Sequence, residues 1–182
     1  LNGSGINFDG DSFTVKSSFT LSQTKPKIAF NTNASANISI GHGLVNVSNL
    51  SISGKITAYK KALKTAVPYA LEADKIYAQG GNVKLDALSI ELANLKVNAN
   101  LNISNNHDVN GDITIPNFKP NRLISTLGLG QEYKNASGLS SAQATIRVNT
   151  KGNLVTLYPF NITVGDSKIN ANAAYNDYKK HL

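Results

Sequence analysis

The 182-residue chain contains no cysteine, no methionine and no tryptophan. Without cysteine there is no disulfide framework and no thiolate metal site. Because a gene product begins with methionine, we expect this chain, which begins at Leu1, to be a fragment of a longer protein. No stretch approaches 18 consecutive apolar residues and no N-terminal signal segment is present, so no membrane-spanning helix is predicted within it.

Charged residues are also few, at 16% of the chain, but they are unbalanced: 18 Lys and Arg against 11 Asp and Glu give a net charge of +7. Such a balance can indicate an anionic partner. Here the basic residues are scattered, and aromatic residues are not interleaved with them as they are on a surface that binds single strands. We therefore expect no nucleic-acid partner.

What the chain does have is alternation. From Lys27 to Ile40, small polar residues, mainly Asn and Ser, alternate with residues that are mostly apolar. Successive side chains of a strand point to opposite faces, so this segment is predicted to be one long strand with an apolar side and a wet side. The positions on the apolar side are Ile28, Phe30, Thr32, Ala34, Ala36, Ile38 and Ile40.

Elsewhere the alternation changes phase within a segment. The change at Ser48–Asn49 predicts a β-bulge, which would bend the sheet. Two further changes between Val83 and Ile103 predict bulges or a short turn near Ala93–Asn94. The stretch from Lys60 to Gln79 is ambiguous: it has some helical spacing, interrupted by Pro68, and it also fits a strand from Tyr69 to Tyr77.

One short helix is expected after Pro120, because proline is favoured in the first helical turn and Leu123, Ile124 and Leu127 then share one face. The sequence therefore predicts a mainly β fold: a large curved antiparallel sheet, an open trough or half-barrel, with one short amphipathic helix. We expect residues 1–182 to form a single β-rich domain.

Residues with catalytic or metal-binding chemistry do not cluster in the sequence. His42, His107 and His181 are far apart, and we interpret them as exposed loop residues. The acidic residues form no recognised metal-binding motif, and no nucleophile elbow or phosphate loop is found in its proper context. We expect no enzyme activity, no metal and no cofactor.

The C-terminal third resembles a known family. From Gly111 to Gly128 the chain reads GDITIPNFKPNRLISTLG, a strand followed by a Pro-x-Phe-x-Pro turn and a short helix. This segment, and the hairpin from Leu154 to Ala171, are similar to a signature of the bacterial AsmA family. The resemblance covers residues 111–175 best and Val45 to Ile103 loosely. It departs at Ala171–Asn172, where the family has glycine, and in the polar linker after the helix.

The resemblance implies a periplasmic, non-enzymatic part of a protein anchored to the bacterial inner membrane by a segment absent from this chain. The family is related to bridge-like lipid transfer proteins, whose curved sheets form a trough for acyl chains. A phospholipid or another acyl lipid is then the expected partner, with a role in lipid transport and outer-membrane homeostasis. Envelope proteins are further possible partners, and membrane contact would come through parts outside this chain.

The residues expected to line such a groove are the large apolar members of the alternating segments: Ile28, Phe30, Ile38, Ile40, Ile52, Ile56, Leu85, Ile90, Val97 and Leu101. The same residues would equally form the closed core of a β-sandwich, since sheets usually pack their apolar faces. The alternative hypothesis is therefore a sandwich that serves as a scaffold for protein contacts in envelope assembly. A carbohydrate-binding domain is a third hypothesis, disfavoured by the scarcity of aromatic residues.

Overall fold

The computed structural model describes residues 2–9, 12–24, 27–58, 66–129 and 137–176, and the side chains of 29–57, 66–129 and 138–176. Most of the described chain is β-strand. The strands are β1 (Asn2–Asp9), β2 (Ser12–Thr24), β3 (Lys27–Gly41), β4 (Leu44–Ala58), β5 (Val67–Gln79), β6 (Asn82–Leu92), β7 (Leu95–Ile103), β8 (Val109–Phe118), β9 (Ala142–Lys151), β10 (Leu154–Val164) and β11 (Ser167–Asn176).

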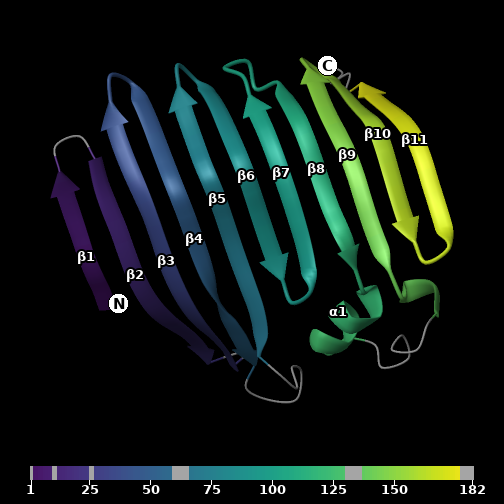
Figure 1. Cartoon of the computed structure of the whole chain (residues 1–182), viewed down its shortest axis with the longest axis horizontal. Coiled ribbons are helices and arrows are strands. Elements are labelled where there is room, and N and C mark those ends of the chain that lie inside the picture. The colour runs from purple at the N-terminus through teal and green to yellow at the C-terminus, as the bar shows by residue number, and fades with distance from the viewer. Residues whose placement is uncertain (1, 10–11, 25–26, 59–65, 130–136, 177–182) are drawn as a thin grey trace, which may run out of the picture.

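All eleven strands belong to one sheet, in which the spatial order is the order of the chain (Figure 1). Each strand pairs antiparallel with its neighbours in sequence, as short turns favour. The described strands β1 and β11 lie at opposite ends of this order, so the sheet is open. The prediction of a large antiparallel sheet is confirmed.

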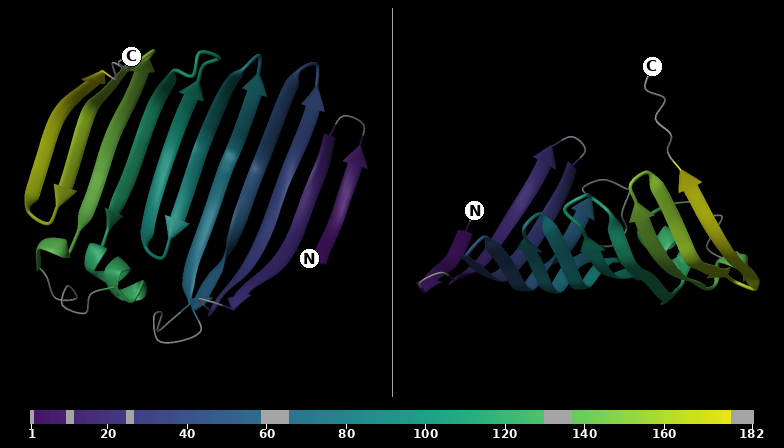
Figure 2. Two further views of the ribbon diagram at one scale, coloured as in Figure 1. Left: turned by 180° about the vertical axis from the view of Figure 1, so that it is seen from behind. Right: turned by 90° about the horizontal axis from the view of Figure 1, so that it is seen from above.

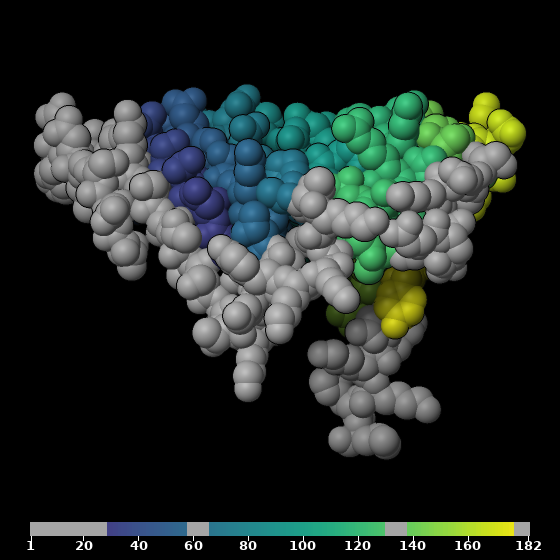
Figure 3. Space-filling model, turned by 90° about the horizontal axis from the view of Figure 1, so that it is seen from below, coloured from purple at the N-terminus to yellow at the C-terminus, as the bar shows by residue number. Residues whose placement is uncertain are grey.

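The sheet is twisted and bent rather than flat. Seen from above, its outer strands cross the view at opposite inclinations and the middle strands bow to one side (Figure 2, right). Seen from below, the described residues from β3 to β11 lie side by side in one continuous row (Figure 3). The described residues therefore form the expected curved open sheet, and not the closed β-sandwich of the alternative hypothesis.

Helical structure is confined to two short segments, α1 (Pro120–Thr126) and the 3-10 turn η2 (Ser137–Leu139). Pro120 stands in the first turn of α1, as predicted, where its missing N–H would have no helical partner. Just beyond the helix and its C-cap Leu127, Gly128 has a φ of +71°, which is costly for residues with a side chain. Leu123, Ile124 and Leu127 are half-buried, and α1 lies beside the strand ends below β8 (Figure 1).

The ambiguous stretch after β4 is resolved in favour of a strand, because β5 runs from Val67 to Gln79 and includes Pro68. Residues 59–65, which belong to the stretch with helical spacing, lie outside the described residues. In β5, the side chain of Val67 is completely buried. The other well-buried apolar side chains of the described residues are small: Ala73, Ala99, Ala142 and Ala144.

Bulges occur where the alternation changes phase. In β4, Asn49 has a φ of +52°, and the pairing with β3 shifts between Ser35 and Asn37. In β6, Ala87 has a φ of +51°, and the pairing with β7 shifts between Leu85 and Leu88. A bulge adds one residue to the strand. The apolar side chains after it therefore stay on the same face of the sheet as those before it, although the alternation in sequence has changed phase. The bulge predicted at Ser48–Asn49 is confirmed.

The second bulge is supported by a side chain from the neighbouring strand. The backbone N–H of Ala87 donates a hydrogen bond to Oδ1 of Asn100, at 2.7 Å between nitrogen and oxygen. A bulge removes this N–H from the sheet ladder, so the Asn100 amide satisfies a donor that would otherwise be unpaired. The other predicted phase change falls in the β6–β7 turn, where Ala93 has a φ of +56°.

Candidate functional site

The register divides the sheet into two chemically distinct faces. Paired residues of neighbouring strands point to the same side, so the pairing can be followed from β3 to β10. One such row is Ile52, Leu71, Ile90 and Val97. We call the side that carries this row the apolar face. Its larger members include Phe30, Ile38, Ile40, Val45, Val47, Leu50, Ile52, Ile56, Leu71, Ile76, Leu85, Leu88, Ile90, Leu92, Leu95, Val97, Leu101, Ile113, Ile115, Ile146, Val148, Leu157, Phe160 and Ile162.

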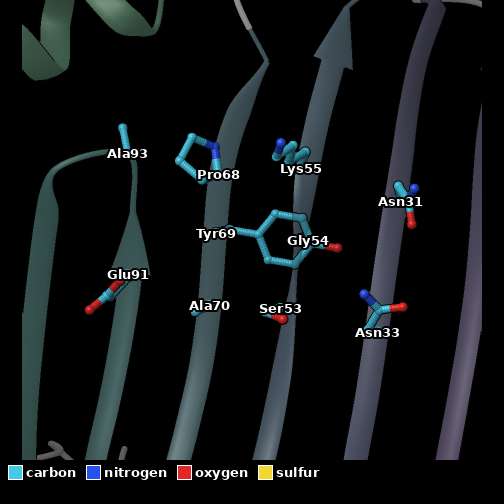
Figure 4. A pocket seen from close by; sticks show the side chains of 10 residues that line it. All are labelled: Asn31, Asn33, Ser53, Gly54, Lys55, Pro68, Tyr69, Ala70, Glu91 and Ala93. Atoms are coloured by element: carbon cyan, nitrogen blue, oxygen red, sulfur yellow. The ribbon is translucent and has the colours of Figure 1, made fainter.

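The opposite side, the polar face, is rich in Asn, Ser, Thr and charged residues. It is turned toward the viewer in Figure 1 and, turned upside down, in Figure 4, where Asn31, Asn33 and Lys55 can be seen. The strands bow toward this side in Figure 2 (right). The apolar face therefore lies on the inner side of the bend, which gives it the form of a shallow trough.

The predicted groove residues lie together on this apolar face. Phe30 pairs with Ile56, Ile90 with Val97, and Leu85 with Leu101. Ile38 and Ile40 pair with Val47 and Val45 at the other end of the same strands, and Ile52 lies between the two groups. Ile28 falls within β3, but its side chain is outside the described residues. The described groove candidates thus share one surface across β3–β7.

That surface is only partly shielded. Ile40 and Ile90 are 51% and 45% exposed, and most other large members are half-buried by their neighbours on the same face. The nine strands from β3 to β11, at about 4.8 Å spacing and ten residues of about 3.3 Å each, give a face on the order of 1,000 Å². The largest apolar patch of a typical monomer is about 300–600 Å². Among the described residues no second layer covers it.

The apolar face extends beyond the groove residues predicted from the sequence. Ile113, Ile146, Phe160 and Ile162 continue it across β8–β10, with the same alternation that identified the first half. Alternation was visible in these segments, but the helix between them separated the two halves in sequence. Only the β8–β9 pairing shows that they adjoin.

One polar interaction lies on the apolar face. The hydroxyl groups of Thr32 and Tyr69 hydrogen-bond to each other although β4 lies between their strands. Gly54 pairs with both residues, and a Cβ on Gly54 would lie 2.7 Å from the Tyr69 hydroxyl. The tyrosine ring therefore occupies the place of the missing side chain, as aromatic residues do beside glycine in sheets. Because Tyr69 supplies a hydrogen-bond partner, the Thr32 hydroxyl is satisfied although its side chain is buried.

The polar face carries cross-strand ion pairs. Arg147 of β9 donates two hydrogen bonds to the Asp112 carboxylate of β8, from Nε at 2.7 Å and from Nη2 at 3.1 Å. These bonds lower the pKa of Asp112 and raise that of Arg147. Lys96 and Glu91 pair at 3.0 Å across β7 and β6. Such exposed pairs contribute little stability, but they fix which residues stand opposite each other.

The polar face also has shallow cavities. One of about 430 Å³ lies over β3–β5 and the β6–β7 turn, lined by side chains that include Asn31, Asn33, Ser53, Lys55 and Glu91 (Figure 4). Its lining is mixed, because these polar side chains alternate with Gly54, Pro68, Tyr69, Ala70 and Ala93. His42 and His107 are both exposed turn residues with positive φ. No three His, Asp or Glu residues of the described chain are grouped so as to hold a metal.

In comparisons with known proteins, no family model, no curated protein and no solved structure matches the chain. Neither described helical segment has the length and apolar character needed to cross a bilayer. The geometry of the apolar face is therefore the main basis for a functional argument.

Proposed function

We propose that this chain binds the acyl chains of phospholipids on its apolar face and passes lipid along the trough without catalysing a reaction. The observation that carries this proposal is the continuous apolar face on the inner side of a bent sheet, uncovered among the described residues. An open sheet with its apolar side exposed to water would be costly and prone to association. A bound hydrocarbon would remove that cost without needing a second protein layer.

The energy of such binding is adequate. Burial of a methylene contributes about 0.8 kcal/mol, so a 16-carbon chain lying on the face gains roughly 10 kcal/mol if it is well covered. A headgroup needs no specific partner and can stay in water at the rims, where the strands end. Because apolar rows such as Ile52, Leu71, Ile90 and Val97 run across the strands, a lipid could move along the sheet without crossing a polar barrier.

The cellular setting is proposed from the resemblance to the AsmA family. The resembling segments are β8 with α1 and the hairpin of β10 and β11, which together form one end of the sheet. On this basis we place the chain in the periplasm, in a protein anchored to the inner membrane, with a role in lipid transport and outer-membrane homeostasis. Contacts with envelope proteins belong to the same proposal.

A photocrosslinking experiment tests the lipid proposal. p-Benzoylphenylalanine is placed at Ile40 or Ile90 on the apolar face, and at Thr145, an exposed residue of the polar face, as the matched control. After irradiation in cells, intact mass spectrometry should show phospholipid adducts at Ile40 and Ile90 and none at Thr145. Adducts with protein at the apolar positions, or no adduct at either, would instead support a scaffold whose apolar face is covered by a partner.

A further inference from the structure

One edge of the sheet is open along its whole length. β11 is the last strand in the spatial order, and all ten of its residues, Ser167–Asn176, are exposed. Among the described residues its only neighbour in the sheet is β10 (Figure 1). In such a strand, every second residue directs its backbone N–H and C=O outward, where they can pair with a strand of another molecule.

β11 lacks the features that usually protect an edge from pairing. It contains no proline, and Lys168 is its one charged residue. The irregularity in its pairing adds a residue to β10 and not to β11, because only Asn172 of β11 lies between the positions paired with Leu157 and Phe160. Long, regular edges with little charge are those that pair with other chains.

The side chains of β11 continue the two faces of the sheet. Ile169 pairs with Ile162 on the apolar face, and alternation along the strand places Ala171, Ala173 and Tyr175 on the same side. Ile169 and Tyr175 lie near opposite ends of the strand and are 55% and 65% exposed. The edge therefore presents two apolar side chains that β10 alone does not cover.

We propose that two copies of this chain pair through β11, antiparallel and about a two-fold axis at Asn172, to form one continuous sheet. In this register Ile169 of each copy stands opposite Tyr175 of the other, and aromatic and β-branched side chains stabilise such cross-strand pairs. Lys168 stands opposite Asn176, so no like charges meet. A two-fold pairing of identical surfaces is also the commonest form of dimer.

Geometry favours this pairing over one between β11 and β1. Neighbouring strands alternate in direction, so β1 and β11 run the same way (Figure 1). With both apolar faces on the same side, β11 meets β1 of another copy only in parallel and β11 of another copy only antiparallel. Antiparallel pairing is slightly more stable, and the pairing of β1 is itself irregular between Gly3 and Ile6. Only the two-fold arrangement closes after two copies.

The absence of cysteine from the chain allows a disulfide test of the register. Asn172→Cys places two thiols opposite each other on the axis, at a Cα separation of about 4.5–5.5 Å that a disulfide accepts. We expect air oxidation to give a covalent dimer on a non-reducing gel. The matched control is Asn170→Cys, at another exposed polar-face position of β11. Its two thiols would be four residues apart, about 13 Å, and should not join.

Sedimentation velocity over a range of concentrations measures the dimer without a crosslink. The interface is small, so the parent chain should shift reversibly from monomer to dimer. Asn170→Lys with Asn172→Lys brings like charges together at the axis and should weaken dimerisation at least about tenfold. The control is Gln143→Lys with Asn149→Lys, which adds the same charge at exposed positions of β9, two strands from the edge. It should dimerise like the parent chain.

Four results would overturn the proposal: a parent chain that stays monomeric at all concentrations, equal crosslinking of the two cysteine variants, assemblies larger than dimers, or a dimer that survives the edge lysines but is lost with Ile40→Asp and Ile90→Asp. The last would mean that two apolar faces cover each other.

Circular dichroism reports the fold of each variant. If the lysine variant does not fold, the two cysteine variants still decide the question. The edge is separate from the lipid-binding surface, so photocrosslinking of lipid at Ile90 should be unchanged by the edge lysines. Either proposal can therefore fail without the other.

Discussion

Thr32 and Tyr69 hydrogen-bond through their hydroxyl groups across an intervening strand, over the backbone of Gly54. Thr32 is only 3% exposed and is surrounded on its face by apolar residues, so its hydroxyl depends on this one partner side chain. The contact ties β3, β4 and β5 together by side chains as well as by backbone ladders.

Gly54→Ala should destabilise the fold by about 2–3 kcal/mol. The added Cβ would collide with the carbonyl oxygen of Asn31 and crowd the Tyr69 ring, and overpacking of this kind typically costs 1–3 kcal/mol. Urea unfolding measures the change. Gly138→Ala is the control, because a Cβ there meets nothing within 4 Å and should alter stability by no more than about 0.5 kcal/mol. Equal losses would show that the space above Gly54 is not restricted.

Tyr69→Phe should cost about 1–3 kcal/mol, since it leaves the buried Thr32 hydroxyl without its partner. Thr32→Val alone should cost less, because the longer Tyr69 side chain can turn its hydroxyl toward water. The double variant should lose clearly less stability than the sum of the losses in the two single variants. A double-mutant cycle by chemical denaturation gives the coupling, and strictly additive losses would contradict the proposed dependence.

Ala87→Gly should stabilise the protein by about 0.5–1 kcal/mol. A positive φ costs an L-residue about 1–2 kcal/mol, which exceeds the entropic cost of glycine, and the bond from the backbone N–H to Asn100 is kept. The comparison variant is Ala144→Gly, at a buried position of β9, which should be destabilising. Thermal unfolding distinguishes the two, and a loss of stability in Ala87→Gly would refute the bulge geometry.

The Asp112–Arg147 pair should make stability depend on pH at the acidic end. The hydrogen bonds from Arg147 lower the pKa of Asp112 in the folded state below its ordinary value of 3.8. Between the two pKa values the unfolded chain binds more protons, so this contribution is present above 3.8 and is lost as pH falls through the folded pKa. The effect is small because the pair is exposed, and salt should weaken it.

Asp112→Asn should therefore flatten the fall in unfolding free energy on acidification below the ordinary carboxyl pKa. Arg147→Gln should flatten it similarly, and combining the two should add little, because either change alone breaks the pair. Denaturation at a series of pH values, repeated at high salt, measures how steeply the unfolding free energy falls on acidification. An unchanged acid slope in both variants would show that the pair does not form in solution.

Ile40→Asp and Ile90→Asp should reduce the phospholipid that co-purifies with the protein, several-fold in combination. A carboxylate in the trough must be desolvated by an acyl chain, which is costly. Both side chains are about half exposed in the lipid-free fold, so the loss of stability should stay near 1 kcal/mol. Gln143→Asp on the polar face is the control for added charge. Equal lipid content in all variants would argue against binding on the apolar face.

Much of the local structure was predictable from the sequence. The alternation from Lys27 to Ile40 predicts β3 and its apolar side, and the phase change at Ser48–Asn49 predicts the bulge at Asn49. Pro120 and the spacing of Leu123 and Leu127 predict α1. These features are local, because the alternation, its change of phase and the helix-starting proline each depend on residues only a few positions apart.

Other features could not be predicted, because they depend on which strands are neighbours. The bond between Thr32 and Tyr69 joins residues 37 positions apart, and only the register of three strands brings them together over Gly54. The described part of the ambiguous stretch, Val67–Gln79, becomes a strand because β4 and β6 both pair with it. No local signal contains that information.

The sequence by itself therefore determined that this protein makes long two-faced strands, since side-chain alternation is a property of each strand alone. Only the tertiary structure decided that the strands join in chain order into a single open sheet instead of a sandwich. The same apolar residues can face a second layer or remain uncovered. The choice is made by pairing and curvature, which align the apolar sides of β3–β10 on one face that no other described element covers.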